Sequence, residues 1–217
     1  MTVPDPILRY LTETYQPYAV IAYGSFADGS ANENSDFDAL VIADHAKKHD
    51  SSVIGGIVLD VFVFPPETFL TDYDPLEFIQ VSDGRILMDQ TGVAEQLQKR
   101  VLDYIEHAPK KTEDELRQEL AWCEKMLSRT CRGDAEGFYR WHWLLCDSLE
   151  IYCDMKGRYY PGPKKALRQM AQADPEAFNT YSRALKSPDR EALSEWVSCL
   201  KKLFLFTDPR EDGKSMK

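Results

Sequence analysis

The sequence predicts an α+β fold, in which a small mixed β-sheet with flanking helices is followed by a C-terminal helical bundle. Short apolar runs that end at glycine or proline fill the first half, which is typical of buried strands. From about residue 93, apolar residues recur at helical spacing. The charge changes as well: residues 1–108 carry 18 acidic and 6 basic side chains, and the remainder carries 18 and 20. We therefore expect two domains, 1–108 and 109–217.

Local patterns define the elements of the first half. Residues 1–16 are predicted as an amphipathic helix, with Asp5 as the N-cap and Pro6 at the first helical position. The stretches 24–35 and 44–50 are predicted as loops because turn-forming residues fill the first and charged residues the second. Strands are predicted at the short apolar runs 18–23, 37–43, 57–64 and 85–88.

Helices are expected throughout the second half. A first helix starts near residue 93 and ends at Pro109, because proline cannot continue a helix. Thr112 and Glu115 form a capping-box pattern that starts the next helix. Three further prolines lie near predicted helix starts. The remaining helices are predicted at 135–156, 163–172, 175–186 and 189–206.

Composition excludes several classes of function. The net charge of −10 overall, concentrated in residues 1–108, argues against binding of long nucleic acids. No run of apolar residues is long enough for a transmembrane helix, and the first 20 residues lack a signal-peptide pattern. The five cysteines form no CxxC pair, so we expect reduced thiols and a cytoplasmic protein.

Three acidic residues lie where they can converge. Asp36 and Asp38 are two residues apart at the start of a predicted strand, so their side chains project to the same face. Asp60 lies inside another apolar strand and needs a partner, because an unpaired buried charge is very costly. If the two strands are neighbours, three carboxylates meet, and such oxygens suit Mg²⁺ or Mn²⁺.

A phosphate-binding turn is predicted beside these acids. Gly24 and Ser25 follow the first strand directly. Glycine permits close backbone approach, and the backbone amides with the serine hydroxyl can hold a phosphate. A short helix at residues 25–28 would add its N-terminal dipole. A phosphate site and an acidic cluster together indicate phosphoryl or nucleotidyl transfer.

The segment from Tyr23 to Val41 resembles the signature of the nucleotidyltransferase fold of the DNA polymerase beta superfamily. That signature is an apolar strand, Gly-Ser, a loop and then Asp-x-Asp in a strand, with a third acid in a later strand. Gly24, Ser25, Asp36, Asp38 and Asp60 occupy these positions. The later sequence looks like the small antibiotic-modifying branch, which includes kanamycin and lincosamide nucleotidyltransferases.

The resemblance implies a metal-dependent enzyme that moves a nucleoside monophosphate, most simply AMP from ATP, to a hydroxyl group and releases pyrophosphate. It implies two Mg²⁺ ions, with Mn²⁺ as an alternative, held by Asp36, Asp38 and Asp60, and phosphates held by Gly24 and Ser25. The acceptor is expected to be a small molecule such as an aminoglycoside or a lincosamide. The general base stays open between Asp60 and an acid of the helical half, Glu150 or Asp147. A homodimer also stays open.

Alternative interpretations remain at this point. The chain could modify a protein, as toxin–antitoxin nucleotidyltransferases do, or could be a non-catalytic nucleotide-sensing module of the same fold. The motif residues also have purely structural explanations: solvated turn acids at 36 and 38, an ion pair at Asp60, and a tight turn at Gly24. His45 and His49, four residues apart in the predicted loop 44–50, form a weak candidate for a metal site.

Overall fold

The computed structural model describes residues 3–207. The chain divides into two compact units, Met1–His107 and Ala108–Lys217.

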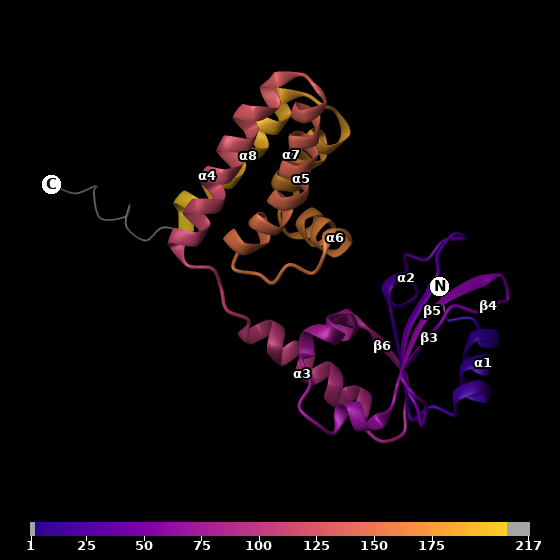
Figure 1. Ribbon diagram of the computed structural model, residues 1–217. Coiled ribbons are helices and arrows are strands. Elements are labelled where there is room, and N and C mark those ends of the chain that lie inside the picture. Colours follow the sequence, from indigo (N-terminus) through magenta and orange to yellow (C-terminus); the bar gives the residue numbers. More distant parts are fainter. Residues whose placement is uncertain (1–2, 208–217) are drawn as a thin grey trace. The chain divides into compact units, whose positions relative to one another are not determined.

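The first unit is built on a mixed sheet of six strands (Figure 1). The strand order is β3-β5-β2-β1-β6, and β4 also pairs with β5. β2 and β5 run parallel, and the other pairs are antiparallel. The strands are β1 (Ala19–Tyr23), β2 (Phe37–Ile42), β3 (Lys48–Asp50), β4 (Val53–Ile54), β5 (Ile57–Phe64) and β6 (Arg85–Asp89).

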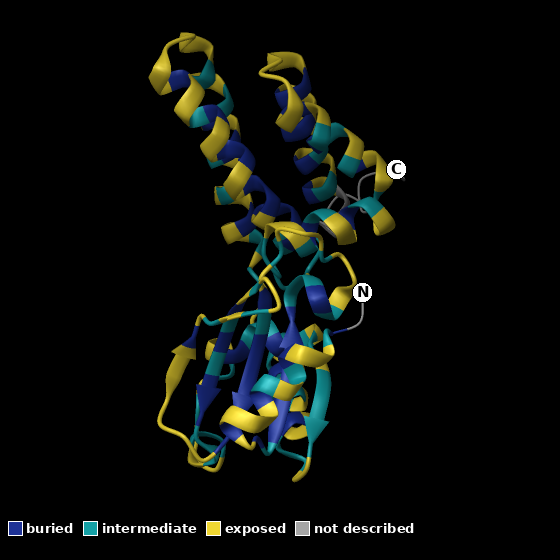
Figure 2. Cartoon of the chain, turned by 90° about the vertical axis from the view of Figure 1, so that its right-hand side faces the viewer, coloured by how far each residue is buried: buried dark blue, intermediate teal, exposed yellow. Residues whose placement is uncertain are grey.

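Both faces of this sheet are covered, which explains why its central strands are apolar without interruption. Helix α1 (Asp5–Tyr15) lies on one face, where Ile7 and Leu11 pack with Val41 and Val61. Helix α3 (Val93–His107) and the 3₁₀ segment η2 (Pro75–Asp83) lie on the other, in a core that includes Leu97, Leu40 and Phe64. The middle of the sheet is accordingly buried (Figure 2).

The alternation of side chains between the two faces of the sheet determines the face on which Asp38 and Asp60 lie. Side chains alternate along a strand, so Asp38 shares a face with Leu40 of β2, and Asp60 shares a face with Phe64 of β5. Leu40 and Phe64 both belong to the core beneath α3. Asp38 and Asp60 therefore project from the α3 side of the sheet.

The second unit is helical. A core around the buried Trp196 joins its long helices, and the Trp196 indole donates a 2.8 Å hydrogen bond to Ser148. Thr112 and Glu115 form the expected capping box at the start of α4. The helices are α4 (Glu113–Arg129), α5 (Ala135–Met155), α6 (Pro163–Ala173), α7 (Pro175–Lys186) and α8 (Arg190–Thr207).

The predicted fold class is confirmed, with two local corrections. Asp5 is not an N-cap: α1 starts at Asp5, and Pro4 is the capping residue, without a side-chain hydrogen bond. The segment 24–35 begins with a short helix, α2 (Gly24–Asp28), which includes the short helix considered at residues 25–28. The predicted loop 44–50 contains β3. Two 3₁₀ segments, η1 (Pro66–Phe69) and η3 (Thr130–Arg132), complete the elements.

The β3 correction has a clear physical origin. Gly55 and Gly56 both have positive φ angles, +60° and +85°, and connect β4 to β5 as a two-residue hairpin. The pairing of Ile54 with Ile57 continues in the same register to the pairing of Lys48 with Val63. Residues 48–54 therefore form one edge arm of a hairpin, not a loop.

Candidate active site

The three acids predicted from the sequence converge at one point of the sheet. Asp38 on β2 lies directly opposite Asp60 on β5 in the parallel register. Asp36 precedes β2 by one residue, and one oxygen of each carboxylate lies within 4.8 Å of the others. The parallel pairing of β2 with β5 is what brings acids 22 and 24 positions apart in sequence together.

The residue types in this cluster fit a divalent cation. Three carboxylate oxygens in such a small volume are hard ligands, as Mg²⁺ and Mn²⁺ prefer. Without a cation, the three like charges would repel one another. The cluster therefore has the composition and spacing of a metal site.

Gly24 lies against the same cluster. It has a φ of +65°, and a Cβ at this position would lie 2.2 Å from Asp38 Oδ2. Any side chain at residue 24 would thus collide with one of the three carboxylates. Ser25 follows in α2, and its carbonyl accepts a 3.0 Å hydrogen bond from the Ala31 amide, which closes the loop that leads to β2.

Asp60 has a partner that the sequence did not indicate. His49 Nε2 lies 2.6 Å from Asp60 Oδ1. The expectation that Asp60 is buried is wrong, because its side chain is 39% exposed and that of His49 is 47% exposed. His49, which was placed in a loop, lies on β3, and its nearest acid is one of the three clustered carboxylates.

Tyr23 is a second residue that motif analysis did not select for the site. It is buried at the end of β1, opposite Asp38 in the antiparallel register. Burial, together with the negative charges of Asp60 and Asp38, raises the pKa of the Tyr23 hydroxyl well above its usual value. The tyrosine therefore stays protonated beside the carboxylates. An aromatic residue at the end of a buried strand carries no distinctive sequence signal.

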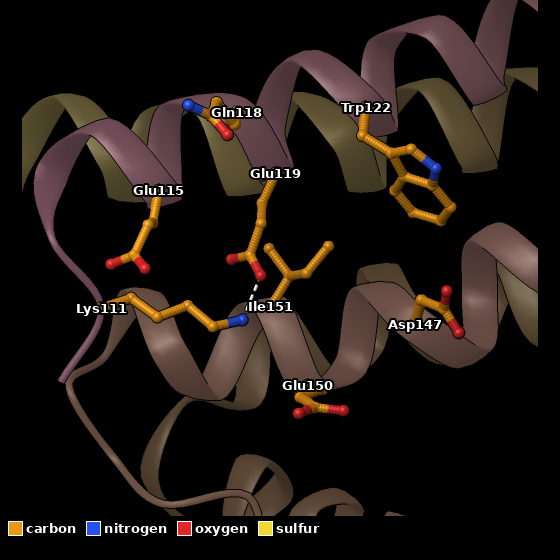
Figure 3. A pocket seen from close by; sticks show the side chains of 8 residues that line it. All are labelled: Lys111, Glu115, Gln118, Glu119, Trp122, Asp147, Glu150 and Ile151. Carbon is orange, nitrogen blue, oxygen red and sulfur yellow. Dashed lines mark hydrogen bonds and ion pairs between the residues drawn. The ribbon is translucent and has the colours of Figure 1, made fainter. Parts of the chain in front are cut away.

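The helical unit contains a pocket of about 500 Å³ between α4 and α5 (Figure 3). The two helical-half acids considered as general bases, Asp147 and Glu150, both line it. Trp122 of α4 extends toward the same space. The lining residues are Lys111, Glu115, Gln118, Glu119, Trp122, Asp147, Glu150 and Ile151.

Charge in this pocket is unbalanced, with four carboxylates and one ammonium group. Lys111 forms ion pairs with Glu119 and, at 2.7 Å, with Asp154. Burial alone would lower the pKa of Lys111. The hydrogen bonds and negative charges of Asp154 and Glu119 have the larger effect, so the pKa of Lys111 lies above its ordinary value. Burial raises the pKa of Glu119, whose Oε2 is buried and accepts no hydrogen bond within the described residues.

Comparison with known protein families identifies the family of the chain. A family model described as a nucleotidyltransferase domain matches residues 5–123, more than half of the chain. The chain belongs to this family, and it is a nucleotidyltransferase enzyme. The matched region includes all three clustered acids as well as Gly24 and Ser25.

Two other comparisons add no further detail. A crystal structure of a nucleotidyltransferase-like protein from Exiguobacterium sibiricum 255-15 is similar, with 15% identity and a TM-score of 0.39 over 92% of this chain and 72% of that chain. No match is found among curated proteins. In the described part of the chain, no helix has both the length and the apolar character needed to cross a bilayer.

Proposed function

We propose that this enzyme transfers AMP from ATP to a hydroxyl group of a small molecule and releases pyrophosphate. The observation that carries the proposal is the convergence of Asp36, Asp38 and Asp60 beside Gly24. In this proposal residues 1–108 are the catalytic domain, and residues 109–217 are a helical domain that contributes to acceptor binding.

The proposed roles follow from residue chemistry. Asp36, Asp38 and Asp60 would hold Mg²⁺ or Mn²⁺, and the bound metal would lower the pKa of an acceptor hydroxyl and neutralise the leaving pyrophosphate. Gly24 and Ser25 would hold the phosphates of the nucleotide. Asp60 would accept the hydroxyl proton.

The helical pocket supports a cationic acceptor. Its four carboxylates exceed its one ammonium group, and the Trp122 ring offers an aromatic face to a positive charge. Glu150 accepts no hydrogen bond within the described residues, whereas Asp147 accepts one from the Trp143 indole at 2.6 Å. An amino-bearing alcohol such as an aminoglycoside fits this chemistry better than a neutral alcohol. A lincosamide, which also carries an amine, is the second acceptor to test.

The donor site is tested by thermal unfolding with each nucleoside triphosphate, with and without Mg²⁺. A nucleotide at 100 times its Kd stabilises the folded state by about 2.7 kcal/mol. We expect a Mg²⁺-dependent rise in Tm with ATP in the wild type and in Asp103→Asn, which changes an exposed acid of α3. We expect none in Asp36→Asn/Asp38→Asn. Absence of a rise with any nucleotide would contradict the proposed donor site.

The acceptor is tested by pyrophosphate release with an aminoglycoside, a lincosamide and a neutral polyol. Glu150→Gln and Trp122→Ala should raise KM for the cationic acceptor and leave ATP binding unchanged. Glu191→Gln, at an exposed position of α8, is the matched control. Transfer of label from ATP to a protein would instead favour the toxin–antitoxin alternative. Nucleotide binding without any transfer would favour the sensing module.

A further inference from the structure

The edge strand β3 is held firmly at its end. Asp50, the last residue of β3, is buried although it is charged. Its Oδ2 accepts hydrogen bonds from the Tyr15 hydroxyl at 2.5 Å and from the Tyr10 hydroxyl at 3.0 Å, and its Oδ1 accepts one from the Ser52 amide at 3.0 Å. Both tyrosines come from α1, so β3 is fixed to the helix behind the sheet.

His49 precedes this anchor and faces the opposite side of the strand. It pairs with Phe62 of β5 across the antiparallel register, and the two rings stack with their centroids 4.7 Å apart and their planes 24° apart. Asp60 lies two residues before Phe62 and therefore projects to the same face. The imidazole is thus held by a ring on one side while its Nε2 reaches Asp60 Oδ1 at 2.6 Å.

We propose that His49 is a positioning residue that orients the Asp60 carboxylate toward Asp36 and Asp38. The inference rests on the proposed metal site. An ionised carboxylate only accepts hydrogen bonds, so the His49 Nε2 carries the hydrogen and donates it to Oδ1. This bond leaves Oδ2 of Asp60 available to a cation.

The need for such a residue follows from exposure. The Asp60 side chain is 39% exposed, so core packing alone does not fix its rotamer. Hydrogen bonds from neighbouring groups orient ligand carboxylates, and their loss typically costs about 10- to 100-fold in metal affinity or activity. The anchored strand supplies the rigidity that a positioning group requires.

The test measures Mn²⁺ binding to the full chain by electron paramagnetic resonance, without nucleotide. His49→Phe keeps the stacking on Phe62 and removes the donor, and we expect Mn²⁺ affinity to fall by about 10-fold or more. His49→Gln places an amide nitrogen near the position of Nε2, and we expect affinity within about threefold of the wild type. His107→Phe, at an exposed histidine of α3, is the matched control and should match the wild type.

Asp38→Asn separates this inference from the proposed metal site. Loss of Mn²⁺ binding in Asp38→Asn, with wild-type affinity in His49→Phe, would overturn the positioning role and leave the metal site in place. Equal weakening in His49→Phe and His49→Gln would also overturn it, because the donor would then not matter. Unchanged binding in Asp38→Asn would overturn the metal site and the inference together. Tm without metal identifies any loss of folding, and His49→Leu replaces His49→Phe if that variant unfolds.

Discussion

The Gly24 backbone lies directly against the Asp38 carboxylate. The antiparallel register pairs Tyr23 with Asp38, so the residue that follows Tyr23 comes next to the acid. A Cβ at residue 24 would lie 2.2 Å from Asp38 Oδ2 and 3.0 Å from Asp38 Cγ. From the sequence, Gly24 was expected to let a phosphate approach the backbone closely. The structure adds a second requirement, since only glycine leaves Asp38 its position in the cluster.

We expect Gly24→Ala to reduce Mn²⁺ affinity and pyrophosphate release by at least about 10-fold, because the new methyl group displaces an acid of the cluster. The positive φ at this position adds strain of about 1 kcal/mol. Mn²⁺ titration and a pyrophosphate assay measure the first effect, and calorimetry measures the second.

Gly55→Ala is the matched control for this prediction. Gly55 has a φ of +60°, close to that of Gly24, but nothing lies within 4 Å of the point that a Cβ would occupy there. Gly55→Ala should therefore lose about 1 kcal/mol of stability, from backbone strain alone, and bind metal normally. Equal Mn²⁺ affinities in the two variants would show that Asp38 tolerates a side chain at residue 24.

Asp50→Asn should destabilise the first unit. Burial alone would raise the pKa of Asp50 above its ordinary value of 3.8. The hydrogen bonds from Ser52 and Tyr15 have the larger effect and lower the pKa to about 2. This difference corresponds to about 2 kcal/mol of folding free energy at neutral pH. Asp44→Asn, which changes an exposed acid bonded to the Tyr18 hydroxyl, should change stability by less than about 0.5 kcal/mol.

The pH dependence of this effect has a definite sign. The folded-state pKa of Asp50 is depressed, so its contribution is fully present above the ordinary value of 3.8 and is lost as pH falls toward about 2. The Tm difference between wild type and Asp50→Asn should be constant above this window and shrink within it. A difference that does not change in acid would mean that the Asp50 charge is not what stabilises the hairpin.

The sequence predicted the central strands and the acid cluster because simple periodic rules govern both. Residues two apart in a strand share a face, which places Asp36 and Asp38 together. The alternation of side chains along a strand could not show whether Asp60 lies near Asp36 and Asp38, because their proximity requires β5 to lie beside β2. The family resemblance supplied this adjacency, and the register of Asp38 with Asp60 confirms that the three acids meet.

The hairpin that carries His49 was missed because its outer strand is polar. Lys48 and His49 are exposed at the edge of the sheet, so no apolar alternation marks them. The available signal was the Gly55-Gly56 pair before the strong strand, since a two-glycine turn favours a hairpin and fixes its register. Counting back from that turn would have placed His49 opposite Phe62.

Lys111→Met should destabilise the helical unit by about 2–4 kcal/mol, because it leaves Glu119 and Asp154 without their shared cation in a partly buried setting. Urea unfolding followed by tryptophan fluorescence reports this unit specifically, because all four tryptophans lie in it. Lys110→Met is the control, since Lys110 is exposed. Equal stability of the two variants would mean that the ion pairs of Lys111 contribute no net stabilisation.

The same variant also tests the charge of the pocket. Removing the ammonium group makes the pocket more negative, so a cationic acceptor should bind more tightly, with a KM lower by about threefold or more. Stability and acceptor affinity are then expected to change in opposite directions. Partial unfolding would lower both the stability of the protein and its affinity for the acceptor. A higher affinity for the acceptor in a less stable variant would therefore point to the altered charge. A higher KM for the cationic acceptor in Lys111→Met would contradict the proposal that this pocket recognises positive charge.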